Sequence, residues 1–249
     1  MVYRRLFTAG LVGLACGLLL PLPGAAEPAS PSYDAALEAF KASRSGGASP
    51  LDADDRRVMK EAAKTLARAM PDPGLKAGEL APDFTLPDAR GDRVRLSALL
   101  EDGPVVLVFY RGAWCPYCNL HLNVLHQSLP TMEALGARLV AITPQRPDKS
   151  RGQVEKDGFP FPILSDLDSA VMKSYGLYFD VPPALTKVYR QRLGLDLEEF
   201  NGPGRNGLPV PGTFVIGEDR RIVAASAHTD YRRRMEPADV IAALRALNP

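Results

Sequence analysis

The chain has 249 residues, of which 46% are apolar and 24% are charged, the balance of an ordinary soluble globular protein. Its 30 Lys and Arg residues almost cancel its 29 Asp and Glu residues. This balance argues against a nucleic-acid-binding or surface-binding protein held by bulk charge, so function must come from a localised site.

The first residues have the layout of a secretory signal peptide. Arg4 and Arg5 make a positive start, residues 6–22 form an almost unbroken apolar run, and small residues follow up to Ala26. The alternative is an uncleaved anchor, which ranks second because the run is short for a span of ~20 residues. We expect residues 1–26 to be removed, leaving a periplasmic or cell-envelope protein without stable membrane insertion.

Residues 27–74 are predicted to form an N-terminal arm that is partly flexible and partly helical. A short helix is expected over residues 33–42, followed by a flexible break over residues 43–49 that contains two adjacent glycines. A second helical pattern covers residues 52–70 and ends at two nearby prolines. The arm carries no constellation of reactive residues, and its pattern indicates an appendage.

The main domain is expected to cover residues 75–249. Residues 105–110 are β-branched and aromatic, which is typical of a central strand buried on both faces. Ser97 is the expected N-cap of a brief helix, and Pro130 should interrupt a longer one. The predicted strands are residues 84–86, 94–96, 105–110, 138–143, 213–217 and 221–225; the predicted helices are residues 97–100, 120–129, 169–176, 182–200 and 237–247. This order predicts an α/β sandwich whose mixed central sheet is flanked by helices.

The chemistry is expected at Trp114-Cys115-Pro116-Tyr117-Cys118. Once residues 1–26 are removed, Cys115 and Cys118 are the only cysteines left, and a bridge between them closes too short a loop to stabilise a fold. The pair lies between a strand and a helix, and a helix N-terminus favours a thiolate. One thiol can attack and the other can resolve the product. The motif therefore predicts a redox-active dithiol.

Two other readings of the cysteine pair are weaker. A zinc site needs two more ligands, and the remaining candidates are His121, His126 and His228. His121 is interpreted as a surface or capping residue rather than a proton shuttle, and we expect neither metal nor cofactor. An inert pair fits poorly with Pro116 and the flanking aromatic residues. A binding module on a redox-inactive fold also stays open, although retention of both cysteines argues against it.

The motif and three later segments resemble one family. Residues 108–119 read Val-Phe-Tyr-Arg-Gly-Ala-Trp-Cys-Pro-Tyr-Cys-Asn, and residues 141–145, 208–216 and 230–237 match further segments. Together they resemble the peroxiredoxin-like branch of the alkyl hydroperoxide reductase/thiol-specific antioxidant (AhpC/TSA) family over residues 75–248. The resemblance implies a thioredoxin fold and reduction of hydrogen peroxide or organic hydroperoxides. It also implies recycling by a thioredoxin-like dithiol protein.

The resemblance also implies roles for single residues. Counting from Tyr110, Arg111 stands where the family has a proline, Cys115 where it has a threonine, and Cys118 where it has the peroxidatic cysteine. Cys118 would attack the peroxide and Cys115 would resolve the sulfenic acid. Pro211 replaces a family arginine, in a setting like that of the cis-proline of thioredoxins, and is expected to face the cysteines. The residues expected to shape the substrate and docking site are Tyr110, Arg111, Trp114 and Pro211.

A second function is compatible with the same motif. In a thiol:disulfide oxidoreductase of the cell envelope, Cys115 would lie closer to solvent and attack a partner's disulfide, and Cys118 would resolve the mixed species. Gln145 is expected either to contact the site or to lie on a loop surface. The arginines at 232–234 are interpreted as a solvated face rather than an anion site.

Overall fold

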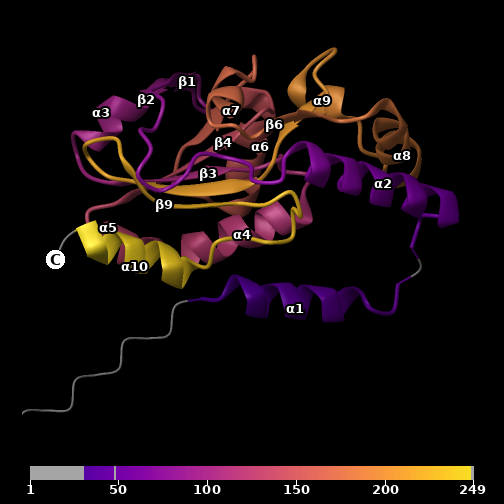
Figure 1. Ribbon diagram of the computed structural model, residues 1–249, viewed down its shortest axis with the longest axis horizontal. Helices are drawn as coiled ribbons and strands as arrows, with labels where there is room; N and C mark the ends of the chain where they lie inside the picture. The colour runs from indigo at the N-terminus through magenta and orange to yellow at the C-terminus, as the bar shows by residue number, and fades with distance from the viewer. Residues whose placement is uncertain (1–30, 48, 248–249) are drawn as a thin grey trace, which may run out of the picture.

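The computed structural model describes residues 31–47 and 49–247, so the predicted signal segment, residues 1–26, lies outside the described residues. A five-stranded sheet in the order β5-β4-β3-β8-β9 forms the centre of the molecule (Figure 1). Its strands are β3 (Val105–Phe109), β4 (Arg138–Thr143), β5 (Ile163–Ser165), β8 (Gly212–Ile216) and β9 (Ile222–Ala227). β3, β4 and β5 are parallel, whereas β8 and β9 are antiparallel to their neighbours, so the sheet is mixed as predicted.

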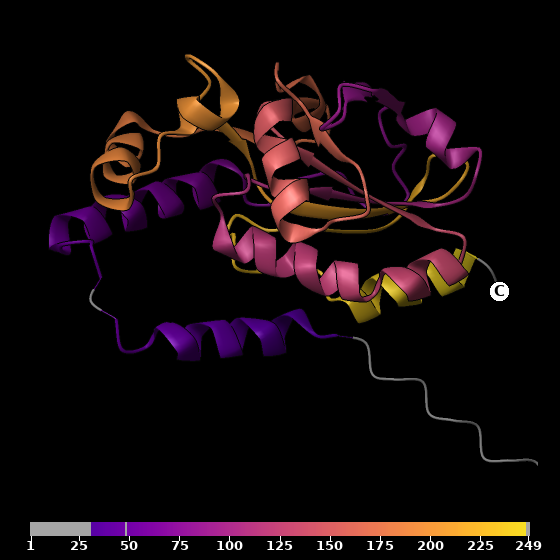
Figure 2. The ribbon, with the colours of Figure 1, turned by 180° about the vertical axis from the view of Figure 1, so that it is seen from behind.

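Each face of the sheet buries a separate apolar cluster. Because side chains alternate along a strand, Val106 and Val108 of β3 face one cluster while Leu107 and Phe109 face the other. The first face is covered by α4 (Pro116–Gln127), α5 (Leu129–Ala134) and α10 (Pro237–Leu247), which run along one side of the sheet in Figures 1 and 2. The second face is covered by the hairpin of β1 (Thr85–Pro87) and β2 (Arg93–Arg95), by α3 (Leu96–Leu100) and by α7 (Ala170–Ser174).

The strand directions bring three loops to one edge of this sheet. The parallel strands β3 and β4 end at the same edge. Strand β8 is antiparallel to β3 and begins there, with Gly212 opposite Phe109. The loop after β3, the loop after β4 and the segment before β8 therefore lie together. The cysteine motif occupies the first of these loops.

Several predicted elements differ in detail. Residues 182–200 form two helices, α8 (Pro183–Leu193) and α9 (Leu197–Asn201), because Gly194 adopts φ 62° and ends α8. The helix α6 (Pro147–Asp157) was not predicted, since its buried side chains, Ser150 and Gln153, give no apolar pattern. The three-residue strands β5, β6 (Tyr178–Asp180) and β7 (Gly207–Pro209) were also missed.

Of the two helix boundaries predicted at Ser97 and Pro130, the first is wrong and the second is confirmed. Ser97 is not an N-cap: it lies inside α3, whose N-cap position is Arg95, and the carboxylate of Asp83 accepts the Ser97 N–H at 3.0 Å. The interruption expected at Pro130 is confirmed, because α4 ends at Gln127 and Pro130 lies in the first turn of α5.

Both helices predicted in the N-terminal arm are present, but the interpretation of the arm as an appendage is wrong. Helix α1 (Tyr33–Arg44) packs on the outer side of α4, with Tyr33 and Leu37 against Val124. The carboxylate of Glu236, just before α10, accepts the backbone N–H groups of Tyr33 at 2.8 Å and Asp34 at 2.7 Å. These are N–H groups of the first helical turn, which need partners outside the helix.

Helix α2 (Ala53–Ala69) lies beside α8, as Figures 1 and 2 both show. Asp52 and Asp55 form a capping box at its start, and Arg192 of α8 pairs with their carboxylates at 2.7 and 2.9 Å. Met59 and Ala62 pack on the apolar cluster beneath α8. Within residues 31–47 and 49–247, no helix is long and apolar enough to cross a membrane.

The anchoring of α1 by Glu236 can be tested directly. Replacing Glu236 with Ala removes both acceptors, and hydrogen bonds to a charged group contribute about 1.5–3 kcal/mol each. We expect amide hydrogen exchange in residues 33–44 to speed up by at least about tenfold, with little change in the central strands. Glu133→Ala, at an exposed position in α5, is the control. Unchanged exchange in α1 of the Glu236 variant would contradict this anchoring.

Candidate active site: a buried dithiol at a helix start

The loop that carries the cysteines is tightly constrained. Gly112 adopts φ 142°, and a Cβ there would lie 2.5 Å from Nε1 of Trp114, so the loop requires glycine. Cys115 is the N-cap of α4, and its Sγ accepts the backbone N–H of Cys118 at 3.4 Å. Both cysteines are free thiols and have 0% and 1% exposure. The expectation that Cys115 lies closer to solvent is therefore wrong.

The pKa values of the two cysteines are shifted in opposite directions. Burial disfavours the Cys118 thiolate, but the hydrogen bond from Cys115 and the charges of Arg234 and Arg111 lower the Cys118 pKa to about 5. Burial, together with the hydrogen bond that Cys115 donates to Cys118, raises the Cys115 pKa well above its ordinary value. Near neutral pH, Cys118 is therefore a thiolate and Cys115 a thiol that donates to it.

Arg234 is the functional residue that sequence reasoning missed. Its guanidinium donates to Sγ of Cys118 at 3.5 Å, so the interpretation of the 232–234 cluster as a solvated face is wrong for this member. The interpretation as a solvated face is correct for Arg232, which is exposed and pairs with Asp230 at 2.8 Å. Only the three-dimensional arrangement could separate these neighbours, since Arg234 meets Cys118 across 116 residues of chain.

The segment that carries Arg234 is held from both sides. Nε2 of His121, in α4, hydrogen-bonds the carbonyl of Met235 at 3.1 Å, and the hydroxyl of Tyr33, in α1, donates to the carbonyl of Arg232 at 2.8 Å. His121 is buried rather than at the surface. Burial and the neighbouring Arg234 lower its pKa to about 3, so it is neutral near pH 7. His121 thus positions a loop and is no proton shuttle at neutral pH.

Arg111 supplies the second positive charge. Its guanidinium carbon lies 5.1 Å from the ring centre of Trp114 and 4.3 Å from that of Tyr231, so two aromatic faces hold it. The side chain is 8% exposed, and no carboxylate pairs with it among the residues that the structure describes. Its Nε has no hydrogen-bond partner in that part of the chain.

A buried polar network fixes the loop below the cysteines. Gln145 accepts the N–H of Ala113 at 3.0 Å, and Asn119 donates to the Ala113 carbonyl at 2.7 Å. Gln153 donates to Asn119 at 3.0 Å and accepts the Tyr110 hydroxyl at 2.7 Å. Of the two places expected for Gln145, contact with the site is therefore confirmed. Tyr110 lies beneath the site, with its hydroxyl already occupied by this network.

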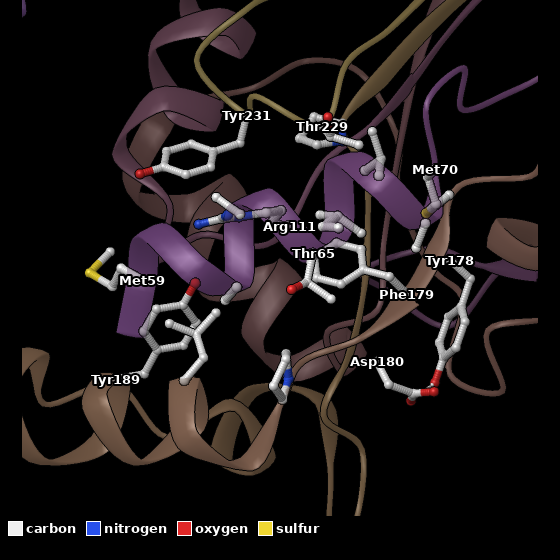
Figure 3. A pocket seen from close by; sticks show the side chains of 18 residues that line it. Met59, Thr65, Met70, Arg111, Tyr178, Phe179, Asp180, Tyr189, Thr229 and Tyr231 are labelled. Carbon is white, nitrogen blue, oxygen red and sulfur yellow. Dashed lines mark hydrogen bonds between the residues drawn. The ribbon is translucent and has the colours of Figure 1, made fainter. Parts of the chain in front are cut away.

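Pro211 lies at the same sheet edge, directly before β8. It lines an apolar cavity. Arg111 and Tyr231 line the same cavity (Figure 3). The resemblance to a thioredoxin cis-proline does not hold, since every peptide bond in residues 31–47 and 49–247 is trans. Within the same residues, no group of three or more His, Cys, Asp or Glu side chains is placed to hold a metal ion.

The chain is similar to known proteins in sequence and in structure. The model of the AhpC/TSA family matches residues 77–225. The Mycobacterium tuberculosis protein named "Putative peroxiredoxin Rv2521" is 31% identical over 151 residues, which are 61% of this chain and 84% of that protein. Peroxiredoxin Bcp of Escherichia coli is 32% identical over 104 residues, 42% of this chain and 66% of that protein. The crystal structure of peroxidoxin BcpB from Mycobacterium tuberculosis matches with a TM-score of 0.55 and 27% identity, covering 70% and 98% of the two chains.

Removal of the Arg234 charge should raise the Cys118 pKa. Because that pKa is lowered, the thiolate exists above about pH 5 and is lost as the pH falls through that value. In Arg234→Met we expect the midpoint to rise by about 1 unit or more, as for loss of a neighbouring opposite charge.

Ultraviolet absorbance of the thiolate, followed against pH in the reduced protein, measures this midpoint. The matched control is Arg232→Met, which removes a surface arginine of the same loop and should leave the midpoint unchanged. Equal midpoints in Arg234→Met and wild type would show that Arg234 does not stabilise the thiolate.

Proposed function

The chain belongs to the AhpC/TSA family and is a thiol peroxidase acting on hydroperoxides, and from that premise we propose that Cys118 attacks the peroxide and Cys115 resolves the product. The observation that supports this assignment is the environment of Cys118. Its sulfur receives the Arg234 guanidinium at 3.5 Å, and a neighbouring thiol lies one helical turn away in the same loop.

In the first step, the Cys118 thiolate attacks the terminal oxygen of the hydroperoxide. An S–O bond forms as the O–O bond breaks, a proton from solvent goes to the departing alkoxide, and the products are a Cys118 sulfenic acid and an alcohol, or water from hydrogen peroxide. The positive charges of Arg234 and Arg111 lie near the Cys118 sulfur, so they are available to stabilise the negative charge that develops on the departing oxygen.

In the second step, the sulfur of Cys115 attacks the Cys118 sulfenic acid. A disulfide forms and water leaves, with the Cys115 proton transferred to the departing oxygen. Because the two residues flank a single turn at the start of α4, this step needs no second subunit and no long chain movement. An external dithiol then reduces the disulfide and is itself oxidised.

The thiol acidities support this order of attack. Cys115, with its raised pKa, is a poor first nucleophile at neutral pH. This difference in acidity favours peroxide chemistry at Cys118 over a thiol:disulfide oxidoreductase in which Cys115 attacks first.

We further propose a thioredoxin-like dithiol protein as the reductant. Pro116 is exposed and lies between the two cysteines, with Tyr117 half-buried beside it, so a flat partner surface can approach the turn that holds the disulfide. The proposed location in the periplasm or cell envelope rests on the pattern of residues 1–26 alone.

Stopped-flow oxidation of the reduced protein by hydrogen peroxide tests the assignment. Trp114, the one tryptophan of the chain, adjoins Cys115 and serves as the fluorescent reporter. We expect fast oxidation of wild type, loss of the reaction in Cys118→Ser to the level of solvent-exposed free thiols, and a retained first step in Cys115→Ser. Oxidation of wild type as slow as that of an ordinary free thiol, together with rapid reduction of insulin disulfides, would favour the oxidoreductase instead.

A further inference from the structure

An apolar cavity lies on the Arg111 side of the dithiol. It encloses about 340 Å³, within the range of about 300–1,000 Å³ that is typical of small-molecule sites. Its apolar lining includes Met59, Ala62 and Leu66 of α2, Phe179 of β6, Leu185 of α8 and Pro211. Figure 3 shows Met59, Phe179 and Tyr189 arranged around this space, with the Arg111 side chain drawn between Tyr189 and Tyr231.

The cavity is polar at one end. Arg111, Tyr189 and Tyr231 line it and also line a second hollow of about 300 Å³, whose other walls include Trp114, Pro116 and Tyr117. The shared residues thus connect the apolar space to the loop of Cys115. The positive charge of Arg111 acts on the dithiol, since it contributes to the lowered pKa of Cys118.

Arg111 is an unusual residue to find in the lining of an apolar cavity. It is more than nine-tenths buried, yet no carboxylate pairs with it in the described part of the chain. The Cys118 thiolate offsets its positive charge, but its buried Nε has no hydrogen-bond acceptor among the described residues, and buried N–H groups ordinarily have one. A ligand with oxygen atoms beside Arg111 would accept hydrogen bonds from its guanidinium. An apolar body on the same ligand would pack against the apolar lining of the cavity.

We infer that the cavity binds the apolar body of a bulky alkyl or aryl hydroperoxide, whose peroxide group lies at the Arg111 end and reaches Cys118 from there. This inference rests on the proposed peroxidase chemistry. It adds that the cavity determines which hydroperoxides the protein prefers as substrates. Helix α2, residues Ala53–Ala69, forms one wall and precedes the family match, which begins at residue 77. The N-terminal arm therefore selects organic hydroperoxides over hydrogen peroxide.

Steady-state kinetics with cumene hydroperoxide and hydrogen peroxide test this selection. We expect the ratio of the two kcat/KM values to favour cumene hydroperoxide in wild type and to fall by about tenfold or more in Ala62→Phe, which fills the cavity. Ala63→Leu is a smaller filling change, for use if the Phe variant folds poorly. Ala67→Phe, on an exposed position of the same helix outside the cavity, should leave the ratio unchanged.

A binding measurement without turnover separates this inference from the proposed function. Cumyl alcohol, the redox-inert product, should bind reduced Cys118→Ser with a change in Trp114 fluorescence, and Ala62→Phe in that background should weaken binding at least about tenfold. Failure of every hydroperoxide to oxidise wild type would overturn the peroxidase mechanism. Fast reduction of hydrogen peroxide, with an unaltered ratio in the filled variants and no alcohol binding, would overturn the cavity assignment alone.

Discussion

A sulfur with 1% exposure has lost almost all contact with water, and an anion there persists only where the protein replaces that hydration. For Cys118 the replacement is a thiol from Cys115, a guanidinium from Arg234 at 3.5 Å and the nearby charge of Arg111. These groups come from one loop after β3 and from the segment before α10. The strand order that brings both to one sheet edge is therefore a requirement of the chemistry.

The N-terminal arm contributes to both sides of this site. Helix α1 holds the segment of Arg234, through the Tyr33 hydroxyl and through the Glu236 carboxylate that accepts its first N–H groups. Helix α2 walls the apolar cavity beside Arg111. Both helices precede residue 77 and therefore lie outside the family match. Arg234, in contrast, lies in residues 230–237, which resemble the family, so the arm supports a site whose reactive groups come from the family domain.

Local sequence patterns predicted much of the fold, because long buried strands and amphipathic helices leave clear periodicities. Strand β4 has the predicted bounds, and the cysteine loop lies at the predicted strand-to-helix junction. The patterns could not predict α6, whose buried face is polar, or the end of α8 at Gly194. Nor could they single out Arg234 from its neighbours, since its role depends on a contact 116 residues away. Burial of both sulfurs likewise depends on tertiary packing.

In the proposed mechanism, one loop contains both the attacking and the resolving sulfur. Mass spectrometry of wild type after one equivalent of hydroperoxide, with free thiols blocked and peptides mapped, can test this assignment. We expect a Cys115–Cys118 disulfide within each monomer, and a sulfenic acid trapped on Cys118 when Cys115 is replaced by Ser. A sulfenic acid that persists on wild-type Cys118, or one that forms on Cys115, would contradict it.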